Sequence, residues 1–443
     1  MILLKNLYKK VFLKNINEFT QLNIICFYAV YISLIFITSI VFYKYFIILY
    51  PQIIDNNLNI VYESIPFAYG ELIENLIVNK KYSSSIFNTE FYLNRLPVVP
   101  FIFFMASFFS SKLYFLIISK NILLFSILFF TILKFSRERN YKLFSFLILN
   151  LIFLYNFYNL KIIYNFVYAD FIVAIFLPLL FIISISNFKF KYFYIGLIIF
   201  ILYLSKANMF PICLALSLYF LFFEKKKIPL IFMLISILSW GLFGYIKTNK
   251  FPFGATVLST NSHALSLSFN KNFHKVYPLI SVDVLDKCHL FQNRYTICKN
   301  LPNKIDNEWE YYNFYKEQNQ KYFEQNKKRL LKDVILKIKT IFFNFYEDGQ
   351  IYKINEPPEK NFDIFIFINK LIVLLAIIIA LKSTINNSFK ISNIKIEIIF
   401  FIILFSSLPP FLLGWAVNRH LVFLFLLSHI YLFLKFKLER KIK

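Results

Sequence analysis

The chain alternates between long apolar runs and shorter polar segments, a pattern typical of a helical protein that crosses a membrane several times. A helix needs roughly 20 apolar residues to span the hydrocarbon core of a bilayer. Several runs are shorter, and the eighth contains Asn369 and Lys370, so the pattern predicts about ten spans. The candidate spans lie near residues 24–43, 113–133, 143–158, 171–186, 192–205, 209–223, 228–246, 364–381, 397–413 and 420–434.

Lysines and arginines gather in alternate loops, and this asymmetry orients the predicted array. Cytoplasmic loops of membrane proteins carry an excess of these residues, so threading ten helices places both termini in the cytoplasm. The first span lacks a small-residue cleavage site and exceeds a signal-peptide core, so we expect it to remain. The basic positions are Lys5, Lys9, Lys10 and Lys14, then Lys134, Arg137, Arg139, Lys142, Lys189, Lys191, Lys225 to Lys227, Lys382, Lys390, Lys395, and Lys435 to Lys443.

Two long segments, residues 44–112 and 247–363, are then predicted to face the outer side. Within the first, stretch 98–109 is apolar but too short to span, so we expect it to lie in the outer interface or to re-enter it. The second long segment separates two membrane parts, so the chain is predicted to consist of an N-terminal membrane domain that includes the first outer loop (1–246), a large outer loop (247–363) and C-terminal helices (364–443).

The second outer segment also has internal order. Residues 306–329 are polar and helix-favouring, and the apolar positions that follow keep helical spacing opposite lysines. This pattern predicts a basic amphipathic helix on the outer leaflet, or alternatively a helix packed against the loop itself. The apolar positions are Leu331, Val334, Ile335, Ile338, Phe342 and Phe345, and the basic ones are Lys332, Lys337 and Lys339.

Composition supports a membrane protein and excludes other classes. Of the 443 residues, 58% are hydrophobic and 16% are charged, whereas soluble domains are about a quarter charged. The 59 Phe and 30 Tyr accompany abundant Ile, Lys and Asn, as in AT-rich coding sequences, so we do not read them as a cofactor site. The net charge of +25 suits anionic lipid headgroups. Nucleic-acid binding would need a soluble basic domain, and we identify none, nor any P-loop, dinucleotide or zinc-protease motif.

Ionisable residues are concentrated on the predicted outer side. Lys206 ends the fifth span and Arg419 precedes the tenth, so separate helices bring both cations to one depth. Taken singly, each residue also fits a solvated loop position, a snorkelling lysine or a helix-end anchor. Taken together they favour a functional site, because charges beside membrane spans are costly. The carboxylates are Asp55, Glu63, Glu71, Glu74, Glu90 and Asp170, and the cations are Arg95, Lys161, Lys206 and Arg419.

Carboxylates and cations at a membrane surface suit the transfer of a sugar from a lipid phosphate. A carboxylate can take the proton from an acceptor hydroxyl as it attacks the anomeric carbon. Cations can stabilise the charge that grows on the departing phosphate. This chemistry needs no nucleotide outside the membrane.

A series of short elements follows the chain in a characteristic order. They are Glu63–Ser64, Phe67, a helix around Leu72 and Leu76, Tyr82, Arg95–Leu96–Pro97 with Pro100, Asp170 in YADF, Ser205–Lys206, the run FGATVLSTNSHALS from Phe253 with the later amphipathic helix, and Arg419–His420. In these elements the chain resembles the C-type, lipid-phosphate-sugar-dependent glycosyltransferases, especially the group that contains protein O-mannosyltransferases and the bacterial aminoarabinose transferase. The resemblance implies an all-α polytopic fold.

The same resemblance implies an inverting glycosyltransferase of the inner or plasma membrane with its active site at the outer face. The base assignment stays open between Glu63 and Asp55; Glu63 is preferred because its distance to Tyr82 and Arg95 suits the pattern. Asp170 would orient the acceptor or the base. Arg95, Lys206 and Arg419 would bind a polyprenyl phosphate, with Tyr82 and His420 in the same site. The need for a divalent cation stays open.

Two other functions compete with this hypothesis. A surface-polysaccharide polymerase or ligase of the O-antigen type would also use lipid-linked sugars, but it would depend on outer arginines more than on Glu63. A lipid or solute transporter would favour internal repeats and Gly-broken helices, whereas this chain has 7 glycines. The expected partners are a polyprenyl-phosphate sugar, a lipid, glycan or protein acceptor, and membrane lipids, but no nucleic acid. Cys288 and Cys298 fall in the outer segment, where a disulfide is expected in an oxidising compartment.

Overall fold

The computed structural model describes most of the helical parts of the chain. The described residues are 21–49, 69–86, 89–93, 95–110, 112–139, 141, 143–159, 169–252, 307–345, 362–386, 394–413 and 421–439. Several residues named above lie outside these ranges, namely Asp55, Glu63, Lys161, Cys288, Cys298, Arg419 and His420.

Each of the ten predicted apolar segments lies in a helix. Five of these helices are long and apolar enough to cross a membrane, namely α3, α6, α11, α17 and α18, and the others are shorter. These candidate spans indicate a multi-pass membrane protein. The helices are α3 (Gln21–Leu49), α6 (Leu113–Glu138), α7 (Leu143–Asn159), α8 (Asp170–Ile185), α9 (Lys191–Ser205), α10 (Phe210–Phe222), α11 (Ile228–Thr248), α17 (Ile364–Asn386), α18 (Lys395–Leu413) and α19 (Val422–Glu439).

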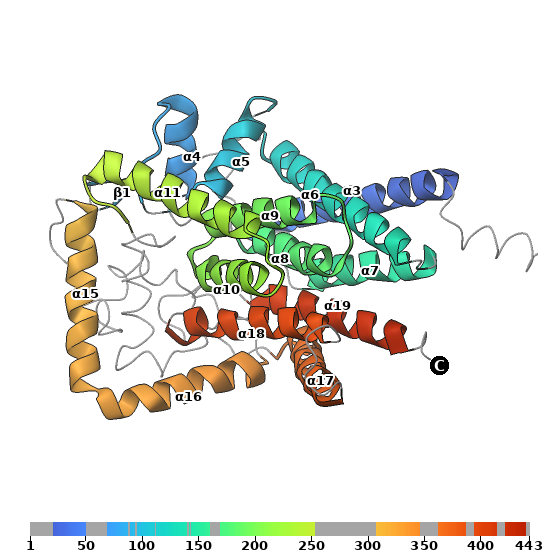
Figure 1. Cartoon of the computed structure of the whole chain (residues 1–443). Coiled ribbons are helices and arrows are strands. Elements are labelled where there is room, and N and C mark those ends of the chain that lie inside the picture. The colour runs from blue at the N-terminus through green and yellow to red at the C-terminus, as the bar shows by residue number, and fades with distance from the viewer. Residues whose placement is uncertain are drawn as a thin grey trace, which may run out of the picture.

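Most of these helices run side by side and form a bundle with two distinct ends (Figure 1). We call one the loop end, where α8 begins and α9 and α11 end, and the other the lysine end, where α8 ends and α9 begins. The helix α15 (Glu308–Gln325) crosses the loop end, on the left in Figure 1, and α16 (Lys327–Phe343) follows it. The C-terminal helix α19 ends at the lysine end.

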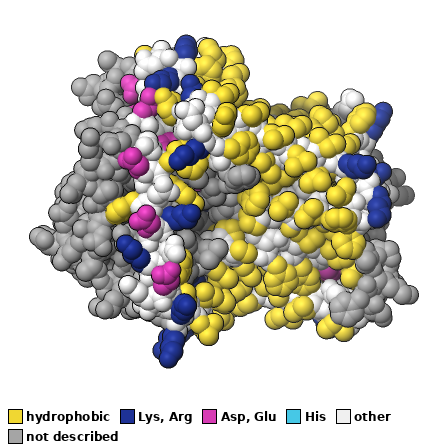
Figure 2. Space-filling view, turned by 60° about the vertical axis from the view of Figure 1, so that its left-hand side comes forward, with side chains coloured by type: hydrophobic (Ala, Val, Ile, Leu, Met, Phe, Trp, Pro, Cys, Tyr) yellow, Lys and Arg dark blue, Asp and Glu magenta, His cyan; other side chains and the backbone are white. Residues whose placement is uncertain are grey.

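The surface of the bundle carries a broad apolar band. In Figure 2 hydrophobic side chains cover this band, with lysines and arginines along its right-hand edge and a column of mixed acidic and basic side chains along the other. Exposed apolar residues occur on several helices, among them Leu123 of α6, Leu238 of α11 and Ile378 of α17. A band of this kind is what a helical bundle presents to lipid.

Aromatic packing and close helix contacts hold the bundle core. Tyr28 and Tyr31 of α3 lie 5.1 and 5.2 Å from the ring of Phe129 on α6, which is the favoured spacing of aromatic pairs. Gly196 of α9 lets Phe232 of α11 approach so closely that a Cβ would lie 2.5 Å from its Cδ2 atom. Small residues at such contacts are typical of membrane helices.

The lysine inside the eighth apolar segment has a structural explanation. Lys370 is buried in α17, and its ammonium group donates a hydrogen bond of 2.6 Å to the carbonyl oxygen of Asn344, just beyond α16. Lys337 of α16 likewise donates at 2.8 Å to the carbonyl of Leu412 near the end of α18. Helix C-termini carry partial negative charge, so each ammonium group neutralises a helix end.

The loop end adds smaller elements that the sequence predicted in part. The helix expected around Leu72 is α4 (Tyr69–Val78), and the apolar stretch 98–109 contains α5 (Val98–Ser107). Residues 306–329 contain α15, and the amphipathic pattern forms α16, whose Leu331, Ile335 and Ile338 are exposed.

The described residues are helical, as expected for an all-α fold, apart from one short hairpin. Strands β1 (Ser84–Ile86) and β2 (Thr89–Phe91) pair antiparallel, with Ser85 opposite Glu90. Strands of three residues are too short to show a reliable alternation of apolar and polar positions, which is why the sequence pattern did not reveal them.

Candidate functional site

Asp170 and Lys206 meet at the loop end of the bundle. α8 begins at Asp170, and α9 ends one residue before Lys206. Since α8 and α9 are joined by the short segment 186–190, the beginning of one helix lies beside the end of the other. The Lys206 ammonium group forms an ion pair with Oδ1 of Asp170, and their side chains are 18% and 9% exposed.

The local structure favours this pair. Asp170 occupies the first turn of α8, where the helix N-terminus stabilises a carboxylate. Lys206 interrupts the helical path with extended backbone (φ −150°, ψ 124°) before the 3-10 turn η4 (Ala207–Met209). Because the pair lies largely out of solvent, removing one partner would leave a charge buried at a cost of roughly 3–5 kcal/mol.

Lys120 lies in the same neighbourhood, although the sequence analysis did not single it out. It belongs to α6 and is 8% exposed, and its Nζ atom lies 4.3 Å from the ring centroid of Phe171. This is within the range of a cation–π contact. Phe171 directly follows Asp170, so Lys120 approaches the beginning of α8. A charged residue within the apolar run 113–133 was the signal that could have revealed it.

Tyr82 and Arg95 are also brought together, at the base of the hairpin. The Tyr82 hydroxyl donates a hydrogen bond of 2.6 Å to the backbone carbonyl of Arg95. The Tyr82 ring packs edge-on against Trp240 and Phe243 of α11, with centroid distances of 6.2 and 5.6 Å. Tyr82 therefore fixes the backbone that carries Arg95 to the bundle.

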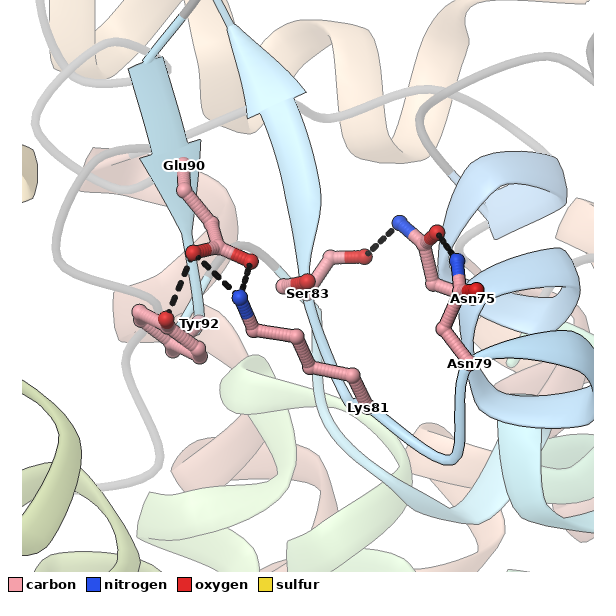
Figure 3. Close-up of polar contacts among 6 residues, drawn as sticks. All are labelled: Asn75, Asn79, Lys81, Ser83, Glu90 and Tyr92. Atoms are coloured by element: carbon pink, nitrogen blue, oxygen red, sulfur yellow. Dashed lines mark hydrogen bonds and ion pairs between the residues drawn. The ribbon is translucent and has the colours of Figure 1, made fainter.

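Glu90 belongs to a polar cluster on the hairpin (Figure 3). Its carboxylate accepts hydrogen bonds of 2.7 Å from Lys81 Nζ and 2.6 Å from the Tyr92 hydroxyl. Burial alone raises the pKa of Glu90, but hydrogen bonds from Lys81, Ser83 and Tyr92 outweigh it and lower the pKa to about 2. This carboxylate is therefore ionised at neutral pH, and its hydrogen bonds stabilise the hairpin.

The same cluster connects the hairpin to α4. Asn75 of α4 donates a hydrogen bond of 2.9 Å to the carbonyl of Ser83, and Asn79 donates one of 2.9 Å to the Asn75 side chain (Figure 3). These contacts hold the loop-end elements as one folded unit.

Glu308 is a buried carboxylate that the sequence analysis did not list. It begins α15, is 3% exposed, and its Oε1 accepts a 2.7 Å hydrogen bond from the backbone N–H of Leu93. Its Oε2 has no hydrogen-bond partner among the described residues. Burial raises the pKa of Glu308 to about 7, although backbone hydrogen bonds from Leu93 and Tyr92 oppose the increase.

α15 begins at this position because Asn307 caps it. The Asn307 side-chain oxygen accepts hydrogen bonds of 3.0 Å from the backbone N–H groups of Trp309 and Glu310, which satisfies two amides that a helix start leaves free. The ammonium group of Lys250, just beyond α11, lies 5.2 Å from the Trp309 ring. The start of α15 is thus held against both the hairpin and α11.

The structure therefore brings the predicted site residues together in two groups. Asp170 and Lys206 form one, and Tyr82 and Arg95 form the other; Asp55, Glu63, Arg419 and His420 lie outside the described residues. Among the described residues no cluster of three histidine, cysteine or acidic side chains could hold a metal ion. The first group, with Lys120 nearby, places one carboxylate and two lysines at one end of three helices. Such a set can hold an anion and orient a hydroxyl group.

Compared with family models, curated proteins and solved structures, the chain matches none of them.

Proposed function

We propose that this chain is an integral membrane glycosyltransferase that moves a sugar from a polyprenyl-phosphate donor to an acceptor at the outer face of the inner or plasma membrane. In this proposal all ten helices cross the membrane, the loop end faces outward and both termini are cytoplasmic. The donor lies in the bilayer with its phosphate at the loop end.

The observation that supports this proposal is the Asp170–Lys206 ion pair. The two residues are 36 positions apart in the chain and come from different helices, yet their charges meet at the loop end, where α8 begins and α9 ends. A lipid-phosphate sugar presents its reacting carbon at the edge of the hydrocarbon region, where its tail stays in lipid and its phosphate meets cations.

The proposed reaction needs a base and an anion-binding group. A carboxylate, Glu63 or Asp55, takes the proton of the acceptor hydroxyl as its oxygen bonds to the anomeric carbon. The bond between that carbon and the phosphate oxygen breaks at the same time, so the configuration inverts and polyprenyl phosphate leaves. Arg95, Lys206 and Arg419 stabilise the charge on the leaving phosphate. Asp170 fixes the position of Lys206.

The amphipathic helix α16 fits the same orientation. Leu331, Ile335 and Ile338 recur at helical spacing and are exposed, beside exposed Lys332 and Lys339. We propose that this face rests in the outer leaflet, because exposed apolar residues flanked by lysines bind an anionic membrane surface.

The direct test uses the purified protein in lipid nanodiscs with radiolabelled polyprenyl-phosphate sugars and a membrane extract as the source of acceptors. Transfer of label by the wild type, and its loss in Glu63→Gln or Asp55→Asn, is the expected result. Glu74→Gln, a change on neighbouring helix α4, serves as the matched control and should transfer normally. Absence of transfer from every polyprenyl-phosphate sugar, with activity on whole lipid-linked repeats instead, contradicts the proposal.

Orientation needs its own measurement. Cysteines introduced at Lys112, beside the loop end, should react with a membrane-impermeant maleimide on intact cells. Cysteines at Asn187, at the lysine end, should react only after permeabilisation. The reverse pattern would place the Asp170–Lys206 pair in the cytoplasm and contradict the proposed outer site.

A further inference from the structure

Glu308 is the buried carboxyl group through which α15 contacts the hairpin region. Its Oε1 atom accepts the 2.7 Å hydrogen bond from the backbone N–H of Leu93, which lies two residues beyond β2 and two before Arg95. Glu308 and Leu93 are 215 positions apart in the chain. This bond therefore joins the outer segment that follows α11 to the loop that carries Arg95 (Figure 1).

The junction leaves polar atoms unpaired when α15 is docked. Oε2 of Glu308 and Nε1 of the adjacent Trp309 are buried, and neither has a hydrogen-bond partner in the part of the chain that the structure describes. A buried polar atom without a partner is unfavourable, because it has given up its hydrogen bonds to water. α15 itself consists largely of charged and amide residues. Its docked position is therefore only weakly favoured.

Glu308 forms no ion pair with another described residue. Lys247 and Lys250, at the end of α11, face aromatic rings instead, with their Nζ atoms 5.5 Å from the Tyr92 ring and 5.2 Å from the Trp309 ring. The other titratable and charged side chains on the described elements around Glu308 are Lys81, Tyr82, Glu90 and Arg95 on the side of the hairpin, and Glu310 and Tyr312 in α15.

Burial favours the protonated form of Glu308. An ionised Oε2 places an unpaired charge in a buried position, which costs far more than the neutral hydroxyl of a protonated carboxyl group. The Glu90 carboxylate also opposes a second negative charge. The Leu93 N–H and the N-terminus of α15 favour the charge, but burial outweighs them and raises the pKa of Glu308 to about 7.

We propose that Glu308 is a proton-controlled latch: when protonated it holds the start of α15 against the hairpin, and when ionised it releases α15 so that water reaches the carboxylate. Lys337 keeps α16 attached to the end of α18, so the released α15 swings about the turn at Asn326. Release uncovers the backbone of Leu93, beside Arg95. This inference goes beyond the proposed function and does not require sugar transfer.

The direction of the pH dependence follows from where the proton binds. The docked carboxyl group has a pKa of about 7, and the released group returns to the ordinary pKa of 4.5. Between these values the docked state holds a proton that the released state has lost, so docking weakens roughly tenfold for each pH unit from about pH 5 to 7. Above pH 7 both states are ionised and the dependence levels off.

Amide hydrogen exchange of the full chain in lipid nanodiscs, read by mass spectrometry, tests the latch. Protection of the peptide that contains Leu93, corrected for the intrinsic effect of pH on exchange, should fall roughly a hundredfold from pH 5 to 7. A peptide around Ile199, in the core of α9, should keep its protection. Constant protection at Leu93 overturns the inference, and so does an equal loss in both peptides, which means that the whole bundle opens.

Glu308→Gln is the decisive variant, because glutamine keeps an oxygen for the Leu93 N–H but cannot ionise. Its protection at Leu93 should be the same at pH 5 and pH 7. Glu310→Gln, two residues later in the same turn and exposed in the wild type, is the matched control and should keep the hundredfold dependence. A dependence that survives in Glu308→Gln, or one that disappears in Glu310→Gln, overturns the inference.

A measurement on the wild type decides if Glu308→Gln does not fold. The difference between the fluorescence spectra of the wild type and Trp309→Phe isolates the emission of Trp309, whose indole nitrogen is buried in the docked state. This emission should shift to longer wavelength from pH 5 to 7, because release exposes the ring to water. Emission that stays constant over this range overturns the inference.

Discussion

The two ends of the bundle treat buried charge differently. At the lysine end, two carboxylates are matched with cations: Glu397 forms an ion pair with Lys435, and Glu224 forms one of 2.6 Å with Lys395. A tyrosine, Tyr192, adds a 2.7 Å hydrogen bond to Glu224. Matched charges of this kind connect helices and need no ligand to balance them.

At the loop end, buried charges meet partners of other kinds. Glu308 accepts a backbone N–H, and Lys120 faces an aromatic ring. Among the described residues of this end, Asp170 and Lys206 form an ion pair in which both side chains are largely buried. The ion pairs of the lysine end connect helices, whereas the Glu308 carboxyl, which a backbone amide holds, is a buried group expected to respond to a proton. We therefore expect structural roles for the Glu397–Lys435 and Glu224–Lys395 pairs and a functional role for the loop-end residues.

The largest expected effect concerns stability at the lysine end. Glu397→Ala leaves the Lys435 ammonium group without its counter-charge in a buried position, which should cost roughly 3–5 kcal/mol of unfolding free energy. Unfolding in mixed micelles measures it. The double variant Glu397→Met/Lys435→Met should recover most of the loss, and sugar transfer per folded molecule should stay at the wild-type rate. A large loss of transfer would break the assignment of this end to structure.

Next in size is the pH dependence that Glu308 confers. Burial raises the pKa of its carboxyl group from 4.5, the ordinary value, to about 7 in the folded protein. Between these values the folded state binds a proton that the unfolded state has released, so stability falls as the pH rises, by roughly 3 kcal/mol in all. Thermal unfolding between pH 5 and 8 should show this slope in the wild type and lose it in Glu308→Gln.

Glu90 gives the opposite dependence and serves as an internal reference. Its pKa is lowered to about 2, so its contribution is present above about pH 4.5 and is lost as the pH falls toward 2. Glu90→Gln should therefore leave the slope between pH 5 and 8 unchanged. An equal slope in Glu308→Gln and the wild type would show that the Glu308 carboxyl is not the source.

A smaller effect is expected from breaking the loop-end ion pair. Asp170→Asn keeps the shape of the side chain but removes the charge that positions Lys206. Sugar transfer should fall roughly a hundredfold, about 2.7 kcal/mol in the barrier. Turnover with labelled donor measures it. Normal transfer in this variant would reduce the Asp170–Lys206 pair to the same structural role as the pairs at the lysine end.

The smallest effects are expected from removing the hydroxyl groups of two tyrosines, one at each end of the bundle. Tyr82→Phe removes the hydrogen bond to the Arg95 carbonyl, and Tyr192→Phe removes the one to Glu224. Each should cost about 1 kcal/mol of stability. Only Tyr82→Phe should raise the KM for the donor, because only that hydroxyl fixes a site residue. Equal KM values for both variants would contradict the contrast between the two ends.

Apolar length predicted the bundle well. The segment predicted near residues 192–205 is the helix Lys191–Ser205, and that near 228–246 is Ile228–Thr248. Such agreement follows because a continuous apolar run in a membrane has few alternatives to a helix. The short strands of the hairpin gave no comparable signal.

The candidate site was predicted less completely. Asp170 and Lys206 could be predicted because both lie at the ends of apolar runs, where alternation of helices determines which ends meet. Lys120 was assigned to a span and Glu308 to a polar helix, so neither was expected to be buried and important. Burial of a charged residue depends on which helices pack against it, and periodicity along one segment does not record that.

The two lysines that neutralise helix ends have a mechanical consequence. Lys337 and Lys370 fasten α16 to α18 and α17, so sliding α16 along its axis would break both contacts together. α15, which precedes it, is fastened to the hairpin instead, through Glu308 and Leu93. The pair α15–α16 therefore links the hairpin region, in the first half of the chain, to α17 and α18 in the last third, and a displacement of the hairpin would be opposed by hydrogen bonds to both of those helices.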